Sequence, residues 1–122
     1  MRGWLMGQIC TSAESPNAIP FLVFGTFGLW LPSVWRVIDE GRIVASSITD
    51  NDRLSEVLPP LLIGQKVRSI DAHGPFHDLE LRFESGMQLE SFSYLERYEN
   101  WTLVGGADKM VIAGPGDSWS AF

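Results

Sequence analysis

The sequence predicts a mainly β fold, in which two pseudo-symmetric β-rich halves form a sandwich or a partly open barrel with one short connecting helix. Apolar residues alternate with charged ones from Asp78 to Glu84, the period of two expected of a strand with one face in water. Similar short stretches also recur in two halves, about residues 5–49 and 62–119. With 122 residues, we expect the chain to form a single domain.

The repeat starts with Gly7–Ser12, which matches Gly64–Ser69 at an offset of 57 residues. Further along, Trp35–Ile38 matches Trp101–Val104, so we expect both leading tryptophans to anchor the core in equivalent places. Single apolar positions also align: Leu22 with Leu79 at the same offset and, with one residue of slip, Leu29 with Met87 and Leu31 with Leu89. Each half is therefore predicted to contain a strand, a hairpin and a second hairpin that begins with tryptophan.

The uncharged stretch of residues 15–35 is close to the length of a membrane-spanning helix. Three prolines and two glycines interrupt it, and its strongly apolar parts, Phe21–Phe24 and Leu29–Leu31, are short. We therefore expect two buried strands joined by a turn, and no contact with a membrane. Both faces of this hairpin are apolar, so a central place in the fold or a protein interface would have to cover them.

A short helix is expected between the halves, at about residues 50–60. Its start holds three residues that can cap a helix: Thr49, Asp50 and Asp52. Pro59 and Pro60 are expected to end it, because proline removes a backbone donor and clashes with the preceding turn. The segment Tyr94–Asn100 fits either one more helical turn or an irregular crossover.

Cys10 is the only cysteine, which excludes an internal disulfide framework and a zinc site with several cysteines. It occupies the apolar strand position that Val67 holds in the second half. We therefore expect a buried structural thiol rather than a nucleophile.

His73 and His77 lie beside Asp71 and Asp78, a set that could in principle bind a metal ion. However, Gly74–Pro75 makes the segment between them a loop, whereas this histidine spacing brings both rings to one face only on a helix. We expect a polar turn and no metal site.

No signature of a catalytic serine or of a phosphate-binding loop is present in the sequence. Gly105–Asp108 fits a hairpin turn between Leu103–Val104 and Met110–Val111 instead. We expect neither catalysis nor a cofactor.

The acidic residues are concentrated in one part of the chain. The net charge is −6, but residues 1–49 hold three bases and three acids and are neutral. From Asp71 to Glu99 there are seven acids and two bases. This acidity argues against a nucleic-acid partner, and it predicts either a solvated, solubilising face or a surface that attracts a basic partner.

Three stretches, Asp78–Leu89, Tyr98–Leu103 and Gly114–Gly116, form a hairpin, a Tyr-x-x-Trp-x-Leu strand and a Gly-Pro-Gly end. In this pattern the chain resembles small bacterial β-rich proteins of the polymorphic-toxin immunity type. The resemblance implies a short, acidic, cytoplasmic and non-catalytic protein. No catalytic residue carries over.

The function expected from these features is tight binding to a cognate toxin domain, which is expected to be basic if it cuts nucleic acid. Acidic residues with interleaved tyrosines are the candidate binding residues: Glu80, Glu84, Glu90, Tyr94, Glu96, Tyr98 and Glu99. The alternatives are a small-ligand-binding β-barrel or a subunit of a homo-oligomer, both suggested by the apolar first hairpin. A metal-dependent hydrolase that uses His73 and His77 is the least favoured alternative.

Overall fold

The computed structural model describes residues 5–73, 78–92, 101–105, 110–113 and 119–121. Within them lie one α-helix, α1 (Asn51–Leu62), and one short 3-10 helix, η1 (Pro16–Ala18). The strands are β1 (Cys10–Glu14), β2 (Phe21–Phe24), β3 (Phe27–Trp30), β4 (Val34–Asp39), β5 (Arg42–Ser46), β6 (Val67–His73), β7 (Asp78–Phe83), β8 (Gln88–Phe92), β9 (Trp101–Val104), β10 (Met110–Ala113) and β11 (Trp119–Ala121). The mainly β prediction with one connecting helix is confirmed.

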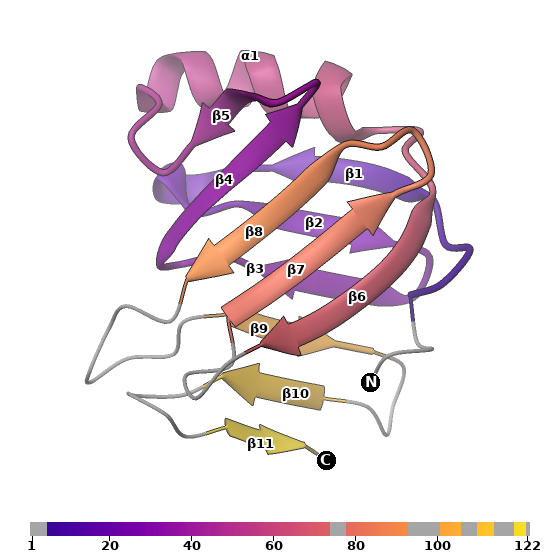
Figure 1. The fold of residues 1–122 in the computed structure, drawn as a ribbon. Helices are drawn as coiled ribbons and strands as arrows, with labels where there is room; N and C mark the ends of the chain where they lie inside the picture. The colour runs from indigo at the N-terminus through magenta and orange to yellow at the C-terminus, as the bar shows by residue number, and fades with distance from the viewer. Residues whose placement is uncertain (1–4, 74–77, 93–100, 106–109, 114–118, 122) are drawn as a thin grey trace.

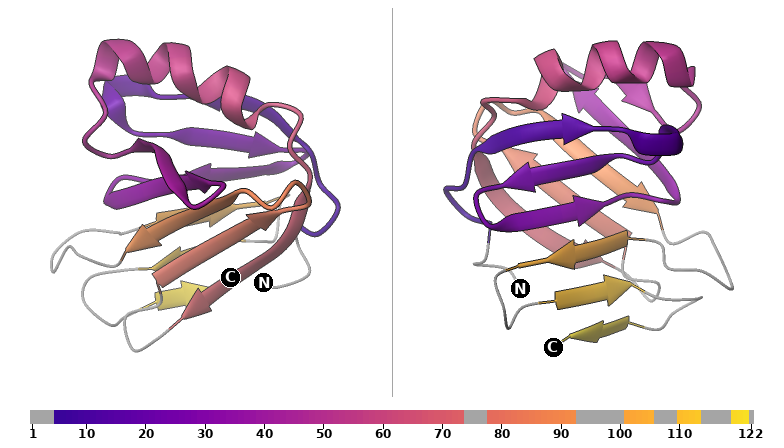
Figure 2. Two further views of the ribbon diagram at one scale, coloured as in Figure 1. Left: turned by 45° about the horizontal axis from the view of Figure 1, so that its top comes forward. Right: turned by 180° about the vertical axis from the view of Figure 1, so that it is seen from behind.

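The strands form two antiparallel sheets that pack face to face (Figures 1 and 2). The first sheet has the order β1-β2-β3-β9-β10-β11, and the second has the order β5-β4-β8-β7-β6. The described strands do not close into a barrel, so of the two predicted architectures the fold is the sandwich.

The two halves of the chain exchange strands between the sheets. In the first half β1, β2 and β3 form a meander in the first sheet, and the chain then crosses to place β4 and β5 in the second. The second half does the reverse, with β6, β7 and β8 in the second sheet and β9 and β10 in the first. Because β3 pairs with β9 and β8 pairs with β4, a pseudo-twofold rotation relates the ten strands.

Backbone contacts between the starts of β1 and β6 mark the pseudo-twofold axis. Ile9 and Lys66, which are equivalent in the repeat, face each other in an isolated antiparallel bridge. Four N–H to O=C hydrogen bonds surround it in two symmetric pairs: Gly7 to Val67 (2.9 Å) with Gly64 to Cys10 (2.8 Å), and Cys10 to Gln65 (2.9 Å) with Val67 to Gln8 (2.9 Å). The Gly7–Ser12 and Gly64–Ser69 match therefore corresponds to a structural equivalence.

The predicted alignment of the next strands is wrong by a shift along the strand. Leu22 faces Ala13 on β1, whereas Leu81, not Leu79, faces the equivalent Ile70 on β6. Leu29 of β3 is likewise equivalent to Leu89 of β8, not to Met87. The reason is that β6 and β7 are longer than β1 and β2, so Leu81 lies eleven residues after Ile70 whereas Leu22 lies nine residues after Ala13. The match of single leucines could not detect this difference.

The core lies between the sheets, and Trp35 and Trp101 are its two largest buried side chains. They occupy equivalent positions on β4 and β9, as predicted. The alternation on β7 is also confirmed, because Leu79, Leu81 and Phe83 are buried while the intervening residues face outward.

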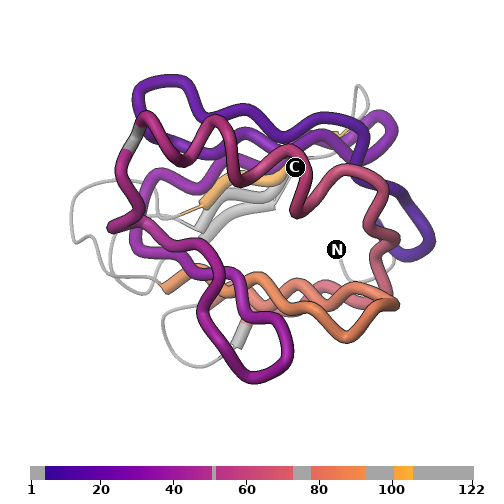
Figure 3. The backbone as a smooth tube through the Cα atoms, turned by 90° about the horizontal axis from the view of Figure 1, so that it is seen from above, coloured from indigo at the N-terminus to yellow at the C-terminus, as the bar shows by residue number. Residues whose placement is uncertain are grey.

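Helix α1 contradicts the predicted end, because it continues through Pro59 and Pro60 to Leu62. Leu54, Leu58 and Leu62 share one face and are buried, and this burial outweighs the backbone hydrogen bonds that the prolines remove. The helix packs against β1 and also touches β5, and it covers one side of the sandwich (Figures 1 and 3).

The start of α1 is set by Asp50, whose backbone oxygen accepts the Leu54 N–H at 2.8 Å. Its side chain makes no capping hydrogen bond. Thr49 does not cap the helix either, because its hydroxyl oxygen accepts the N–H of Ser46.

The uncharged stretch forms the hairpin β2–β3, with a turn at Gly25–Thr26. Only one of its faces is buried in the core, through Leu22, Phe24 and Leu29. The other face points outward, so the fold does not cover it, and of the two alternatives only a protein interface stays open for this face. Among the described residues, no helix is long and apolar enough to cross a membrane.

Candidate functional site

The outer face of the second sheet carries a line of acidic side chains across three neighbouring strands. Glu90 on β8 lies directly opposite Glu80 on β7, and Glu80 lies opposite Asp71 on β6. We call Asp71, Glu80 and Glu90 the acidic row. Side chains in directly opposite positions have Cβ atoms about 5 Å apart, so Glu80 is the immediate neighbour of both Asp71 and Glu90.

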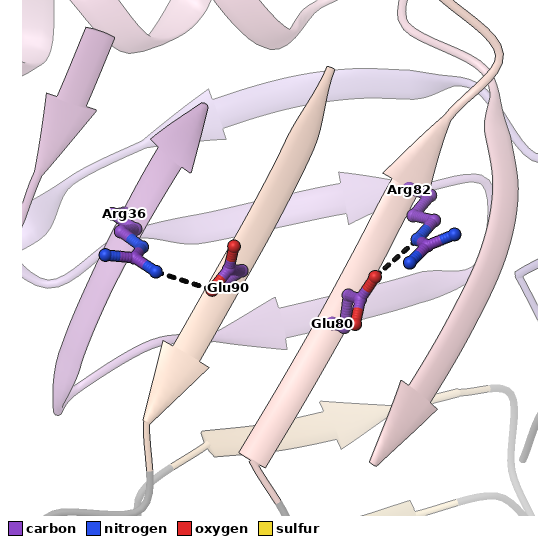
Figure 4. Close-up of polar contacts among 4 residues, drawn as sticks. All are labelled: Arg36, Glu80, Arg82 and Glu90. Atoms are coloured by element: carbon purple, nitrogen blue, oxygen red, sulfur yellow. Dashed lines mark hydrogen bonds and ion pairs between the residues drawn. The ribbon is translucent and has the colours of Figure 1, made fainter. Parts of the chain in front are cut away.

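Two arginines border the acidic row (Figure 4). Arg36 on β4 lies opposite Glu90, and its Nη2 donates to Glu90 Oε2 at 3.1 Å. Arg82 on β7 donates from Nε to Glu80 Oε1. Each arginine therefore orients one carboxylate of the row.

Arg36 is held by a second contact, with its guanidinium 5.0 Å from the centroid of the Phe92 ring. Ring faces attract cations, so Phe92 and Glu90 fix this side chain from two directions. One end of the acidic row therefore carries a positive charge in a defined position.

The acidic row places like charges in adjacent positions on one sheet face. Like charges directly opposite each other destabilise a sheet, and three carboxylates follow one another here. The side chains of Glu80 and Glu90 are each 21% exposed, so both carboxylates reach the surface. The strands hold them at fixed spacing, which favours recognition of a surface with complementary charges.

Of the predicted binding residues, the structure brings Glu80 and Glu90 together. Glu84 is exposed in the turn after β7, where its backbone N–H donates to the Lys66 carbonyl at 2.9 Å. It does not belong to the acidic row. The other four predicted residues lie outside the described part of the chain: Tyr94, Glu96, Tyr98 and Glu99.

Four residues of this site were not predicted as binding residues: Asp71, Arg36, Arg82 and Phe92. Asp71 belonged to the acidic segment, but only the β6–β7 register shows that it lies beside Glu80. Arg36 comes from the neutral half of the chain and joins the site because the halves exchange strands. Its place between Trp35 and Val37 indicates an outward side chain, but no sequence signal shows that β4 lies next to β8.

The metal-ligating alternative gains no geometric support from the described residues. His73 ends β6, and His77 lies outside them. Among the residues described, no group of three or more His, Cys, Asp or Glu side chains has a geometry that could hold a metal ion.

Cys10 is buried on β1, and burial raises the pKa of its thiol to about 11. Hydrogen bonding with the backbone of Ser12 lowers the pKa, but by less than burial raises it. The thiol therefore stays protonated near neutral pH, which agrees with the structural role predicted for it.

Comparison of the chain with protein-family models, curated proteins and solved structures finds no match.

Proposed function

We propose that this chain is a non-catalytic binding module that captures a basic protein partner on the outer face of its second sheet. The observation that carries the proposal is the acidic row, Asp71, Glu80 and Glu90, set side by side on three strands. Like charges held side by side repel one another and lower the stability of the free protein. A partner surface of opposite charge would relieve this repulsion on binding, which would raise the affinity.

The arrangement also supports recognition in one orientation. Arg36 gives the row a positive end beside Glu90, so the charge pattern differs between its two ends. A partner with lysine or arginine side chains would place them over Glu80 and Asp71 and away from Arg36. Charge patterns of this kind reject wrong partners and accelerate encounter.

The partner that fits best is a toxin domain of the kind that acts on nucleic acid. Proteins that bind nucleic acid carry basic surfaces, and an acidic protein face that occupies such a surface would block access to the substrate. The resemblance to immunity proteins in the second half of the chain points in the same direction. In this proposal the module acts in the cytoplasm, where an immunity protein protects the cell that makes the toxin.

The proposal is tested with the toxin domain that should be encoded immediately upstream of the gene for this chain. Its affinity for the wild type is compared with that for the triple variant Asp71→Lys, Glu80→Lys and Glu90→Lys, which should bind at least tenfold more weakly. A control reverses three exposed charges elsewhere, Glu40→Lys, Asp52→Lys and Glu56→Lys, and has the same net charge.

The control variant should keep its affinity within about twofold. Equal losses in the two variants would show that only net charge matters and would remove the acidic row as the site. A neighbouring gene that encodes no toxin would remove the toxin as the partner and leave only the basic-partner proposal.

An oligomer subunit is the second candidate, and the observation that favours it is the outward apolar face of β2 and β3. A particle mass that doubles with concentration in light scattering, and that a polar substitution at Val23 reverses, would support it. The alternative of a ligand-binding β-barrel has no support here, because the described strands form two separate sheets.

A further inference from the structure

The first sheet carries an aromatic pair at the positions where the second sheet carries two glutamates. Phe21 lies opposite Trp30 on β2 and β3, as Glu80 lies opposite Glu90 on β7 and β8. The residues that flank this pair on the neighbouring strands are equivalent as well. The equivalent positions, with the first-sheet residue named first, are Glu14 and Asp71, Phe21 and Glu80, Trp30 and Glu90, and Thr102 and Arg36.

The aromatic pair forms a continuous surface because Gly28 lies beneath it. The rings of Phe21 and Trp30 have centroids 4.3 Å apart with an interplanar angle of 32°. A Cβ atom added at Gly28 would come within 2.7 Å of the Phe21 ring, so only glycine lets this ring lie across β3. Such packing of an aromatic ring over a strand glycine stabilises an exposed sheet face.

This surface is open to solvent. Trp30 is 36% exposed, and Phe21 and Val23 are partly exposed. The right panel of Figure 2 shows the first sheet from behind, and no described helix or strand lies over its outer face. Exposed tryptophan at a well-ordered position is a frequent centre of binding energy in interfaces.

The second sheet shows which group an aromatic ring and a carboxylate hold together in this fold. There, the guanidinium of Arg36 contacts both the ring of Phe92 and the carboxylate of Glu90. On the first sheet Trp30 and Thr102 stand at the positions of Glu90 and Arg36, so this contact itself is not repeated. The same kinds of group lie side by side at other positions, because exposed Glu14 lies opposite Phe21, whose ring contacts that of Trp30.

We propose that Phe21, Trp30 and Glu14 form a second binding site, which takes the guanidinium of an arginine side chain presented by a protein partner. The ring faces attract the cation, and the Glu14 carboxylate accepts its N–H donors. The site lies on the opposite side of the sandwich from the acidic row and does not depend on the proposed function of that row.

The site is tested by titrating N-acetyl-arginine methylamide and following the tryptophan indole N–H signals by NMR. The matched control probe is N-acetyl-citrulline methylamide, which has nearly the same shape but no charge. We expect the arginine probe to bind weakly, to shift the Trp30 signal at saturation, and to bind at least threefold more tightly than the citrulline probe.

Three variants locate the site. Trp30→Leu keeps an apolar side chain but removes the large ring face, and should weaken arginine binding at least threefold. Glu14→Gln should weaken it about two- to fourfold and leave citrulline binding unchanged. The double variant Glu80→Gln and Glu90→Gln alters only the opposite face and should leave the Trp30 shift intact.

Three results would overturn the proposal. Equal binding of the two probes would make the surface an apolar patch without selectivity for a cation. Loss of the Trp30 shift in the Glu80→Gln and Glu90→Gln variant would place the arginine on the acidic row. Self-association of the protein with burial of Trp30 would identify a second copy as the occupant.

Discussion

The rings of Phe24 and Phe83 stack with their centroids 6.4 Å apart, one ring from each sheet. Each residue ends the second strand of its half, and they face equivalent residues, Cys10 and Val67, on the neighbouring strands. The contact therefore joins the two halves at the pseudo-twofold axis, on the core side of the bridge between Ile9 and Lys66. It makes the packing of one sheet depend on the other.

A double-mutant cycle on this pair measures that dependence. Phe24→Leu and Phe83→Leu should each lower the free energy of unfolding by about 1–2 kcal/mol, since each removes buried ring atoms. The double variant should lose about 0.5–1.5 kcal/mol less than the sum, because the ring contact can be lost only once. Urea unfolding followed by far-UV circular dichroism gives the three values.

The control cycle combines Phe24→Leu with Ile43→Ala, an exposed position on the edge strand β5. These two effects should add to within about 0.5 kcal/mol. A coupling between Phe24 and Phe83 no larger than that of the control would mean that the two sheets pack independently here.

The sequence was sufficient to predict the fold class, the equivalence of Trp35 and Trp101 and the outward charges of β7, because each depends on a local period or on a strong residue match. It was insufficient for the strand exchange. The pairing of β4 with β8 depends on how the two halves rotate about Ile9 and Lys66, and a repeat alone does not say which sheet each hairpin joins.

The same limit applies to the candidate site. Glu80 and Glu90 were predicted from the concentration of acids between Asp71 and Glu99, and the register of the β7–β8 hairpin brings them together. Arg36 was missed because its partner is far away in the chain. The end of α1 was missed because Pro60 argues locally for a stop, whereas burial of Leu62, a tertiary effect, keeps the chain helical.

Replacement of Pro60 by alanine tests this view of the helix. Pro60 is exposed, so the change removes little packing, and it restores an N–H that can donate to the Glu56 carbonyl. The gain is reduced by the greater freedom of the unfolded chain, so the free energy of unfolding should rise by about 1–2 kcal/mol. Thermal and urea unfolding measure it.

Pro60→Gly serves as the control, because glycine restores the N–H but has about 1 kcal/mol lower helix propensity than alanine. It should be less stable than Pro60→Ala by about that amount. A loss of stability in Pro60→Ala would show that the proline contributes a contact or a rigidity that outweighs the missing hydrogen bond.

The raised pKa of Cys10 predicts a pH dependence at alkaline pH. The native thiol keeps its proton up to about pH 11, whereas the thiol of the unfolded chain ionises above about pH 9.0. Between these values the unfolded state holds fewer protons, so the free energy of unfolding falls as the pH rises, by at most about 1.4 kcal/mol per pH unit.

Cys10→Val removes this ionisation and places on β1 the residue that the equivalent position on β6 carries. The difference in unfolding free energy between the wild type and this variant should be constant below pH 9 and should then change in favour of the variant. Cys10→Ala should show the same change from a lower starting stability. If the unfolding free energies of all three proteins change in parallel from pH 8 to 11, the pKa of the Cys10 thiol is not raised.

Arg36 should stabilise the acidic row. Arg36→Gln removes the ion pair with Glu90 and the contact with the Phe92 ring, and it removes one positive charge from beside three neighbouring carboxylates. The free energy of unfolding should fall by about 1 kcal/mol in 20 mM salt. About half of this loss should disappear in 0.5 M salt, because ions screen the repulsion within the row but do not replace the ring contact.

Arg82→Gln is the matched control, because Arg82 also contacts one glutamate of the row but has a more exposed side chain, 55% against 39% for Arg36. Its loss should be smaller in 20 mM salt and close to zero in 0.5 M salt, as expected for an exposed ion pair. If the two variants lose equal stability at both salt concentrations, Arg36 has no role beyond its charge, and the ring of Phe92 does not hold it in place.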